Sequence, residues 1–263
     1  MNRNVLLTIE YDGTNFSGWQ RQQDKRTVQG ELEEVLSLVC KTPVQLNGTS
    51  RTDAGVHALG QRASFVADFG IPVEKLADVV NNLLAGGQNS RTKGSDIKII
   101  SVEEKPMDFH ARFDSRGKLY RYVIDNSGTR NIFRRNYTYS VKEPLNIDDM
   151  RRAADFIVGT HDFKCFEASG SNPRKTTVRT INFLDIRKDE DDIVVEVAGD
   201  GFLYNMVRII VGTLVEVGIG KIHPMAIESI INSKDRQNAG HTAPPEGLYL
   251  VEVYYSQGTG ETV

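Results

Sequence analysis

The chain has 263 residues, of which 39% are hydrophobic and 25% are charged, and this composition is sufficient for one or two globular domains with an apolar core. It contains no run of about 18 apolar residues, and its first residues lack the apolar stretch of a signal peptide, so we expect no membrane helix and no secretion. The formal net charge of −3 argues mildly against a nucleic-acid partner.

The first part of the chain predicts the order β-α-β-β-α-β. Strands are predicted at residues 5–11, 43–46, 61–67 and 97–102, where apolar and β-branched residues alternate or cluster between turn residues. Helices are predicted after the N-cap candidate Thr27 and from Pro72, because apolar residues then recur at helical spacing. Residues 48–60 and 85–95 are predicted to be loops.

The second part predicts the same order with one extra helix. Strands are expected at residues 118–125, 178–187, 193–197 and 248–255. Helices are expected at 146–158, with Asn146 as the N-cap, at 203–217 and after Pro224. Two successive β-α-β-β-α-β units are typical of an α+β fold made of two ferredoxin-like halves. We place the halves at residues 1–106 and 107–263.

Cysteine and cofactor patterns are sparse. Cys40 and Cys165 lie outside any CxxC or Cys/His cluster, which favours buried thiols in a reducing cytoplasm over a disulfide or a metal site. No P-loop and no Rossmann glycine fingerprint occurs. We therefore expect no cofactor and no metal.

Basic residues are concentrated between His110 and Arg135, on a chain whose acids gather elsewhere. Such a segment is suited to contacting phosphates, although the charge pattern alone favours a solvated face. The candidates for phosphate contacts, there and in other loops, are Arg21, Arg112, Arg116, Arg134, Arg135, Arg174 and Lys175.

The most informative local pattern is the polar loop Arg51-Thr52-Asp53-Ala54-Gly55-Val56-His57-Ala58 between two predicted strands. It offers one carboxylate, Asp53, flanked by Arg51 and His57, and loops on a rigid sheet often carry catalytic groups. Turn statistics alone favour a plain turn at Asp53 and Gly55.

This loop resembles the active-site motif of the tRNA pseudouridine synthase A family. The resemblance extends along the chain in the order of the family. It is carried by Tyr11-Asp12-Gly13-Thr14, Gly18-Trp19-Gln20-Arg21-Gln22, Phe109-His110-Ala111-Arg112-Phe113, Tyr120-Arg121-Tyr122, Gly159-Thr160-His161-Asp162-Phe163, Gly201-Phe202-Leu203-Tyr204-Asn205-Met206-Val207-Arg208 and Ala243-Pro244-Pro245-Glu246-Gly247-Leu248.

The resemblance implies an isomerase that turns uridine into pseudouridine at positions 38, 39 and 40 of the anticodon stem-loop of tRNAs. It also implies the pseudouridine synthase fold, in which the two halves join in one large, mainly antiparallel sheet with helices on one face. A cytoplasmic homodimer that binds tRNA, with no membrane association, is expected.

By the same resemblance, Asp53 is the catalytic nucleophile and Arg208 the cation that keeps it ionised. An arginine among apolar helix neighbours is costly without a partner, which favours such a role. Tyr120 is expected to stack on the target base, Leu248 to pack in the pocket, and Arg51 to contact RNA as the base is flipped out. For His57 a structural role is the better interpretation, and for Trp19 RNA stacking and a core position are both open.

Three alternatives are weighed. A nucleoside hydrolase or glycosidase usually needs two carboxylates, and the loop supplies one. A catalytically silent RNA-binding protein leaves the Asp53 motif unexplained. A synthase of the same family with other target uridines is hard to distinguish, because site choice depends on how the whole tRNA docks.

Overall fold

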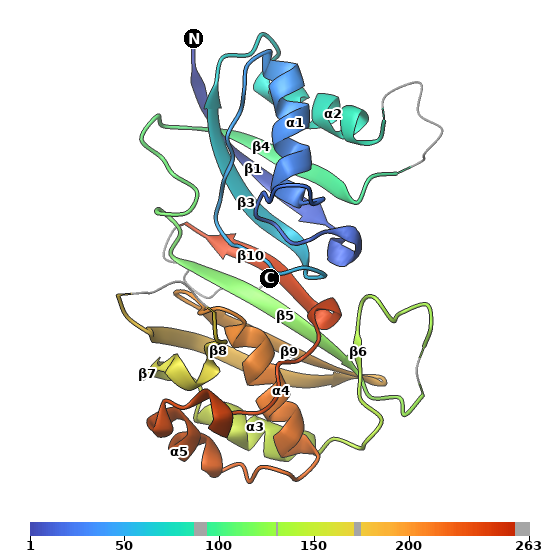
Figure 1. The fold of residues 1–263 in the computed structure, drawn as a ribbon, viewed down its shortest axis with the longest axis vertical. Helices are drawn as coiled ribbons and strands as arrows, with labels where there is room; N and C mark the ends of the chain where they lie inside the picture. Colours follow the sequence, from blue (N-terminus) through green and yellow to red (C-terminus); the bar gives the residue numbers. More distant parts are fainter. Residues whose placement is uncertain (87–93, 130, 171–174, 256–263) are drawn as a thin grey trace. The chain divides into compact units, whose positions relative to one another are not determined.

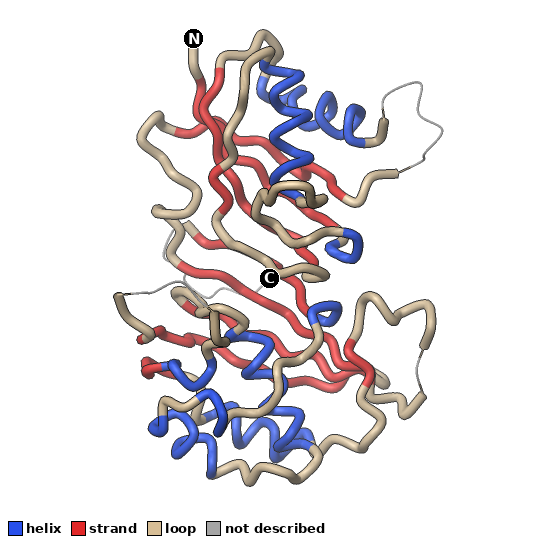
Figure 2. The backbone as a smooth tube through the Cα atoms, viewed as in Figure 1, coloured by secondary structure: helices blue, strands red, loops and turns tan. Residues whose placement is uncertain are grey.

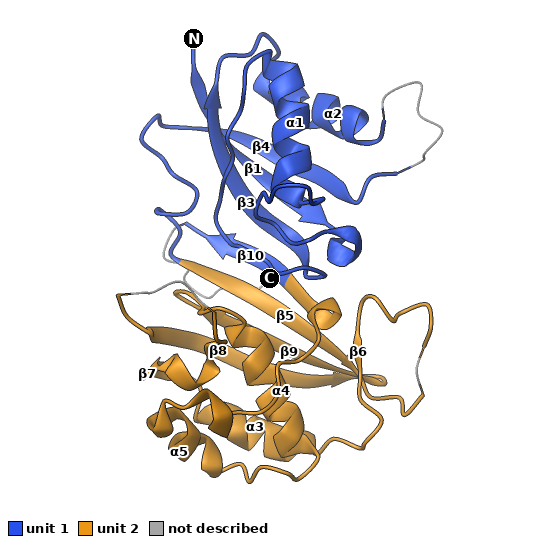
Figure 3. Ribbon diagram, viewed as in Figure 1, with its two compact units in different colours: residues 1–116, 250–263 blue, residues 117–249 orange. Residues whose placement is uncertain are grey.

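The computed structural model describes residues 1–86, 94–129, 131–170 and 175–255, and within them the chain divides into two compact units. Unit 1 contains residues 1–116 and the C-terminal residues from Leu250, and unit 2 contains residues 117–249 (Figure 3). The sequence prediction divided the chain after residue 106 instead, and kept the last strand with the second half.

Unit 1 is a layer of antiparallel strands covered by two helices (Figure 1). Its strands run in the order β4-β1-β3-β10, and the short β2 pairs with β3. The helix α2 packs against α1 and β4. The elements are β1 (Arg3–Tyr11), α1 (Val28–Cys40), β2 (Asn47–Gly48), β3 (His57–Ala67), α2 (Val73–Leu84), β4 (Ile97–Lys105) and β10 (Leu248–Tyr254), whose first two residues belong to unit 2.

Unit 2 has the same kind of architecture. Its strands run in the order β5-β9-β8-β7, all antiparallel, and β6 pairs with β5 in parallel. The helix α3 packs against α4 and β8. The elements are β5 (Gly117–Asp125), β6 (Tyr139–Ser140), α3 (Ile147–Asp155), β7 (Gly159–Asp162), β8 (Val178–Asp189), β9 (Asp192–Gly199), α4 (Met206–Gly218) and α5 (Ala226–Ser233).

The prediction of a mixed α and β fold with mainly antiparallel strands is confirmed. Figure 2 distinguishes the helices from the strands by colour. Two of the predicted caps are also correct. The Thr27 side chain accepts the Gly30 N–H at 3.2 Å at the start of α1, and the Asn146 side chain accepts the Asp149 N–H at 3.2 Å at the start of α3. Each bond satisfies a backbone donor of the first helical turn.

The predicted strand at residues 43–46 is wrong. The Val44 N–H donates to Ser37 Oγ at 2.9 Å, and the Leu46 N–H donates to Glu33 Oε1 at 2.9 Å. Because side chains of α1 take these backbone donors, the segment has no need of a neighbouring strand. Pairing begins only at β2.

Both cysteines are buried free thiols, as the sequence predicts. Burial raises the pKa of the Cys165 thiol to about 12 and also raises that of Cys40. Among the residues described, no helix has the length and apolar character needed to cross a bilayer.

Candidate active site

Asp53 lies in the loop between β2 and β3, and the entry of this loop is hydrogen-bonded to β3. The Thr49 N–H donates to the Arg62 carbonyl at 2.8 Å. The fully buried Gln61 side chain holds Ser50 from both sides, because its Oε1 accepts the Ser50 N–H at 3.2 Å and its Nε2 donates to the Ser50 carbonyl at 2.8 Å. These bonds fix the backbone just before Asp53.

The segment that follows β1 lies directly against the other side of this loop. The Trp19 N–H donates to the Thr52 carbonyl at 3.0 Å, and the Tyr11 hydroxyl forms a buried hydrogen bond of 2.7 Å with Thr52 Oγ1. Gly18 has a φ of +94°, and a Cβ there would lie 2.7 Å from the same carbonyl. Only glycine meets both requirements at position 18.

Asp53 itself opens a tight turn. Its carbonyl accepts the Val56 N–H at 3.2 Å, and Gly55 has a φ of +80°. A Cβ on Gly13 would lie 2.0 Å from the Val56 carbonyl, so the backbone of the β1–α1 connection packs on the end of this turn. The expectation of a turn is therefore correct, and the turn carries a half-buried aspartate on a tightly packed loop.

Trp19 belongs to the core, so it does not stack on RNA. It is 1% exposed, and its ring lies against Gly48, where a Cβ would be 2.3 Å from the indole Nε1. The Tyr11 and Trp19 rings have their centroids 6.1 Å apart. The indole thus fills the space behind the Asp53 loop.

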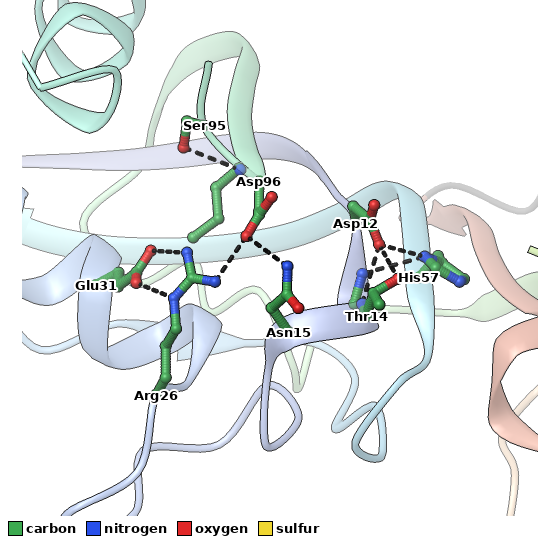
Figure 4. Close-up of polar contacts among 10 residues, drawn as sticks. Asp12, Thr14, Asn15, Arg26, Glu31, His57, Ser95 and Asp96 are labelled. Atoms are coloured by element: carbon green, nitrogen blue, oxygen red, sulfur yellow. Dashed lines mark hydrogen bonds and ion pairs between the residues drawn. The ribbon is translucent and has the colours of Figure 1, made fainter. Parts of the chain in front are cut away.

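His57 ends the loop in a buried position at the start of β3. Its Nδ1 lies 3.1 Å from the Gly13 N–H and 3.2 Å from Asp12 Oδ1, and Asp12 also accepts the Thr14 N–H at 2.9 Å (Figure 4). The ring therefore fastens the loop to the turn after β1. This arrangement agrees with a structural role for His57.

A second polar cluster holds the β1–α1 connection from its other end (Figure 4). Arg26 lies 2.6 Å from both Glu31 Oε1 and Asp96 Oδ2, and its guanidinium carbon is 4.2 Å from the centre of the Phe16 ring. Partial burial lowers the pKa of Arg26, but its hydrogen bonds to the two carboxylates outweigh this effect and raise it. Arg26 thus ties the connection to the residue that precedes β4.

Of the predicted site residues, Asp53 and Arg51 belong to unit 1, and Tyr120, Arg208 and Leu248 belong to unit 2. Arg51 is exposed, so its guanidinium is accessible to a macromolecular ligand.

Tyr120 and Tyr122 share one face of β5, and the Tyr122 hydroxyl makes a structural hydrogen bond. The Tyr122 hydroxyl donates to the Pro244 carbonyl at 2.7 Å, and burial raises its pKa well above the ordinary value. Tyr120 is 6% exposed, and its ring meets Phe202 edge-on with centroids 5.1 Å apart. The bond to Pro244 gives Tyr122 a structural role within unit 2.

Arg208 lies on α4 and is held by its own unit. Its Nε donates to the Ala243 carbonyl at 2.7 Å and its Nη1 donates to Asn205 Oδ1 at 3.0 Å, while the Ala243 N–H donates to the Arg208 carbonyl at 3.0 Å. Leu248 is buried at the start of β10. The contacts of Arg208 fix its guanidinium at the first turn of α4. The buried position of Leu248 is equally compatible with a core role.

The predicted phosphate-contacting residues differ in their surroundings. Arg112, Arg116, Arg135 and Lys175 are exposed, and Arg21 is exposed although it pairs with Glu33 at 3.0 Å. Arg134 is half-buried in an ion pair with Asp192 that raises its pKa, so its charge is largely compensated. Arg174 lies outside the described residues, as does most of the predicted loop at 85–95.

Sequence reasoning missed the contributions of Gln61 and Tyr11 to the loop. Both lie inside predicted strands, and the burial of Gln61 was evident only from the structure. Among the described residues, no group of three or more His, Cys, Asp or Glu side chains is placed to hold a metal ion.

Comparison with known proteins gives consistent matches. A family model described as tRNA pseudouridine synthase matches residues 7–114 and 153–256. tRNA pseudouridine synthase A of Acetivibrio thermocellus is 50% identical over 96% of this chain and 100% of its own length. "tRNA pseudouridine synthase A 2" of Clostridium tetani is 49% identical over 97% of this chain and 100% of its own length. A solved Cbf5-Nop10-Gar1 complex aligns with 94% of this chain and 56% of its own, with 11% identity and a TM-score of 0.31, which is too weak to bear on the fold.

Proposed function

Because the chain belongs to the tRNA pseudouridine synthase family, we propose that it modifies uridines 38, 39 and 40 of the anticodon stem-loop and that Asp53 is its catalytic carboxylate. The reaction itself, isomerisation of uridine to pseudouridine in tRNA, is that of the family. The choice of these three positions rests on the resemblance described above.

The reaction sets the requirements for the site. The bond between N1 of the base and C1′ of the ribose breaks, the base turns over, and C5 bonds to C1′ while the C5 proton leaves and N1 gains one. No group is added and no electrons are exchanged. The site therefore needs a carboxylate that acts as nucleophile or stabilises the ribosyl intermediate, held at a fixed position beside the sugar.

The observation that carries the proposal is the support of the Asp53 loop. Gln61 holds the loop from β3, the backbone at Gly13 and Gly18 packs on the loop from the β1–α1 connection, and His57 at the end of the loop accepts the Gly13 N–H. A half-buried carboxylate on a loop fixed from two sides is suited to preorganised catalysis, because little rearrangement is needed when the substrate enters.

The remaining residues have roles in binding. We assign Tyr120 to stacking on the target base, Arg51 to contacting the RNA while the base leaves its stem, and Arg208 and Leu248 to substrate binding. A phenol ring presents a flat face to a pyrimidine, and the Arg208 guanidinium is already oriented by Ala243 and Asn205.

We also propose a homodimer in the cytoplasm. The resemblance supports the dimer, and two free buried thiols fit a reducing compartment. Sedimentation equilibrium of the full chain gives the mass of the particle, and a concentration-independent monomer would contradict the dimer.

The first experiment is tritium release from tRNA that carries 5-tritiated uridine, with wild type and Asp53→Asn compared. We expect release by the wild type, none by the variant, and tRNA binding by both. Release by the variant at the wild-type rate would remove Asp53 from its proposed role. Mapping pseudouridine by carbodiimide modification and primer extension then tests positions 38–40, and modification elsewhere would favour a synthase with other targets.

A further inference from the structure

Residues 106–116 of unit 1, called here the 106–116 segment, present an aromatic ring to solvent. Phe113 is 75% exposed. A single exposed apolar side chain needs no explanation by itself, so the backbone that holds Phe113 and the charges beside it decide whether the ring is placed to bind a ligand. The backbone of this segment is fixed at its middle and at both ends.

The middle of the segment is bound to the base of the Asp53 loop. Ala111 is fully buried, its N–H donates to Ser64 Oγ on β3 at 3.1 Å, and its carbonyl accepts the Thr49 hydroxyl at 3.0 Å. Thr49 begins the loop that carries Asp53. The exposed ring therefore stands on the same support as the proposed catalytic residue.

The two ends are also anchored. The buried Asn4 side chain donates from Nδ2 to the carbonyls of Pro106 and Phe109, each at 2.8 Å. At the other end the Arg116 N–H donates to the Tyr254 carbonyl at 2.7 Å. The position of Phe113 thus depends on strands β1, β3 and β10 together.

The ring has a partner that orients it but does not cover it. The centroids of the His110 and Phe113 rings are 4.2 Å apart with an interplanar angle of 33°, and the Phe113 N–H donates to the His110 carbonyl at 3.1 Å. The Asp114 carboxylate accepts the His110 N–H at 2.7 Å, so it caps the turn. The exposed surface of the Phe113 ring is therefore accessible to a flat ligand.

Charge favours a nucleic-acid ligand over a second protein surface. Arg112 and Arg116 are exposed on either side of Phe113. The 106–116 segment has two exposed acids, Asp108 and Asp114, and the Asp114 carboxylate accepts a hydrogen bond from within the segment. Aromatic rings set between cations are typical of surfaces that stack on bases and contact phosphates, whereas protein interfaces centre on contiguous apolar residues.

We propose that Phe113 stacks on an unpaired base of the tRNA, with Arg112 and Arg116 contacting neighbouring phosphates. This inference rests on the proposed function, because it requires tRNA to be the ligand. Unpaired bases are the parts of RNA that offer an open face to an aromatic side chain. The ring would then position the RNA relative to the Asp53 loop through their shared anchor at Thr49.

The test measures binding of an unmodified tRNA transcript with uridines at 38–40 to Phe113→Ala, Phe113→Leu and Phe113→Trp. Leucine keeps the apolar volume but not the flat ring, and tryptophan keeps the ring. We expect affinity to fall roughly fivefold or more in the alanine and leucine variants and to be retained in the tryptophan variant. Leu38→Ala, which removes a 66% exposed apolar side chain from α1, is the matched control and should bind as the wild type does.

Salt dependence separates stacking from charge. The Phe113 variants should keep the wild-type slope of log affinity against log salt, whereas Arg112→Ala with Arg116→Ala should reduce it by roughly 0.7–0.9 for each lost phosphate contact. Urea unfolding of each variant checks that it is folded.

Several outcomes would overturn the inference. Binding by Phe113→Leu as tight as that of wild type excludes ring stacking, and a change in sedimentation with unchanged tRNA binding assigns the ring to contact with a second copy. If the wild type releases tritium while the Phe113 variants bind normally, this inference fails and the proposed function stands. If the wild type binds tRNA but releases none, the proposed function fails independently of Phe113.

Discussion

Gly13→Ala should slow catalysis without abolishing RNA binding. A Cβ on Gly13 would lie 2.0 Å from the Val56 carbonyl oxygen, whereas ordinary contacts begin at 3.4 Å, so the two backbones must separate by 3.4 − 2.0, or about 1.4 Å. If both share the movement, Val56 and the turn that begins at Asp53 shift by roughly 0.7 Å. Misplacement by about 1 Å can cost roughly a hundredfold in rate.

We therefore expect single-turnover tritium release to fall roughly 10- to 100-fold in Gly13→Ala, with tRNA affinity within about twofold of wild type. The crowding should also lower the free energy of unfolding by about 1–3 kcal/mol. Gly70→Ala is the matched control, because Gly70 is exposed in the same unit and a Cβ there would meet nothing within 4 Å. A Gly13→Ala enzyme with the rate of the Gly70→Ala control would refute the idea that this packing positions Asp53.

Two further predictions concern stability. Tyr122→Phe removes the hydroxyl that donates to the Pro244 carbonyl and should lower the free energy of unfolding by about 1 kcal/mol in urea titrations. An unchanged urea midpoint would contradict this, and retained tritium release would separate Tyr122 from Tyr120. Burial raises the pKa of Glu196, but ion pairs with Arg187 and Arg121 outweigh it and lower that pKa below its ordinary 4.5. Because the folded-state pKa is depressed, the stabilisation is present above about pH 4.5 and is lost as the pH falls through the folded-state value. Glu196→Gln should therefore be less stable than wild type at pH 7, and the difference should shrink in urea titrations at lower pH; a difference that is constant with pH would contradict the assignment.

Local features of the sequence were sufficient for most secondary structure. The N-cap candidate Thr27 with the helical spacing of apolar residues identified α1, and the N-cap candidate Asn146 with Asp149 in the first turn identified α3, because these signals lie within one short segment. The alternation of residues 118–125 identified the strand β5 in the same way. The same reasoning failed at residues 43–46, because the backbone donors of Val44 and Leu46 are taken by side chains from α1.

In the candidate site, too, the sequence identified individual residues but not their contacts. The resemblance selected Asp53 from the sequence alone, and it also marked Gly13 and Gly18, but no pattern indicated that both glycines pack against the backbone of the Asp53 loop. That contact joins segments far apart in the chain, so local spacing does not encode it.

The sequence by itself determined the class of the elements, the family and the identity of the proposed catalytic carboxylate, since these depend on local periodicity and on motif residues in order. The tertiary structure decided which charged and aromatic groups are available to RNA. Trp19 is buried behind the Asp53 loop, Arg134 is paired with Asp192, and Phe113 stands exposed on a fixed backbone. Burial and pairing are properties of neighbours brought together by folding, so residue type alone did not distinguish these three side chains.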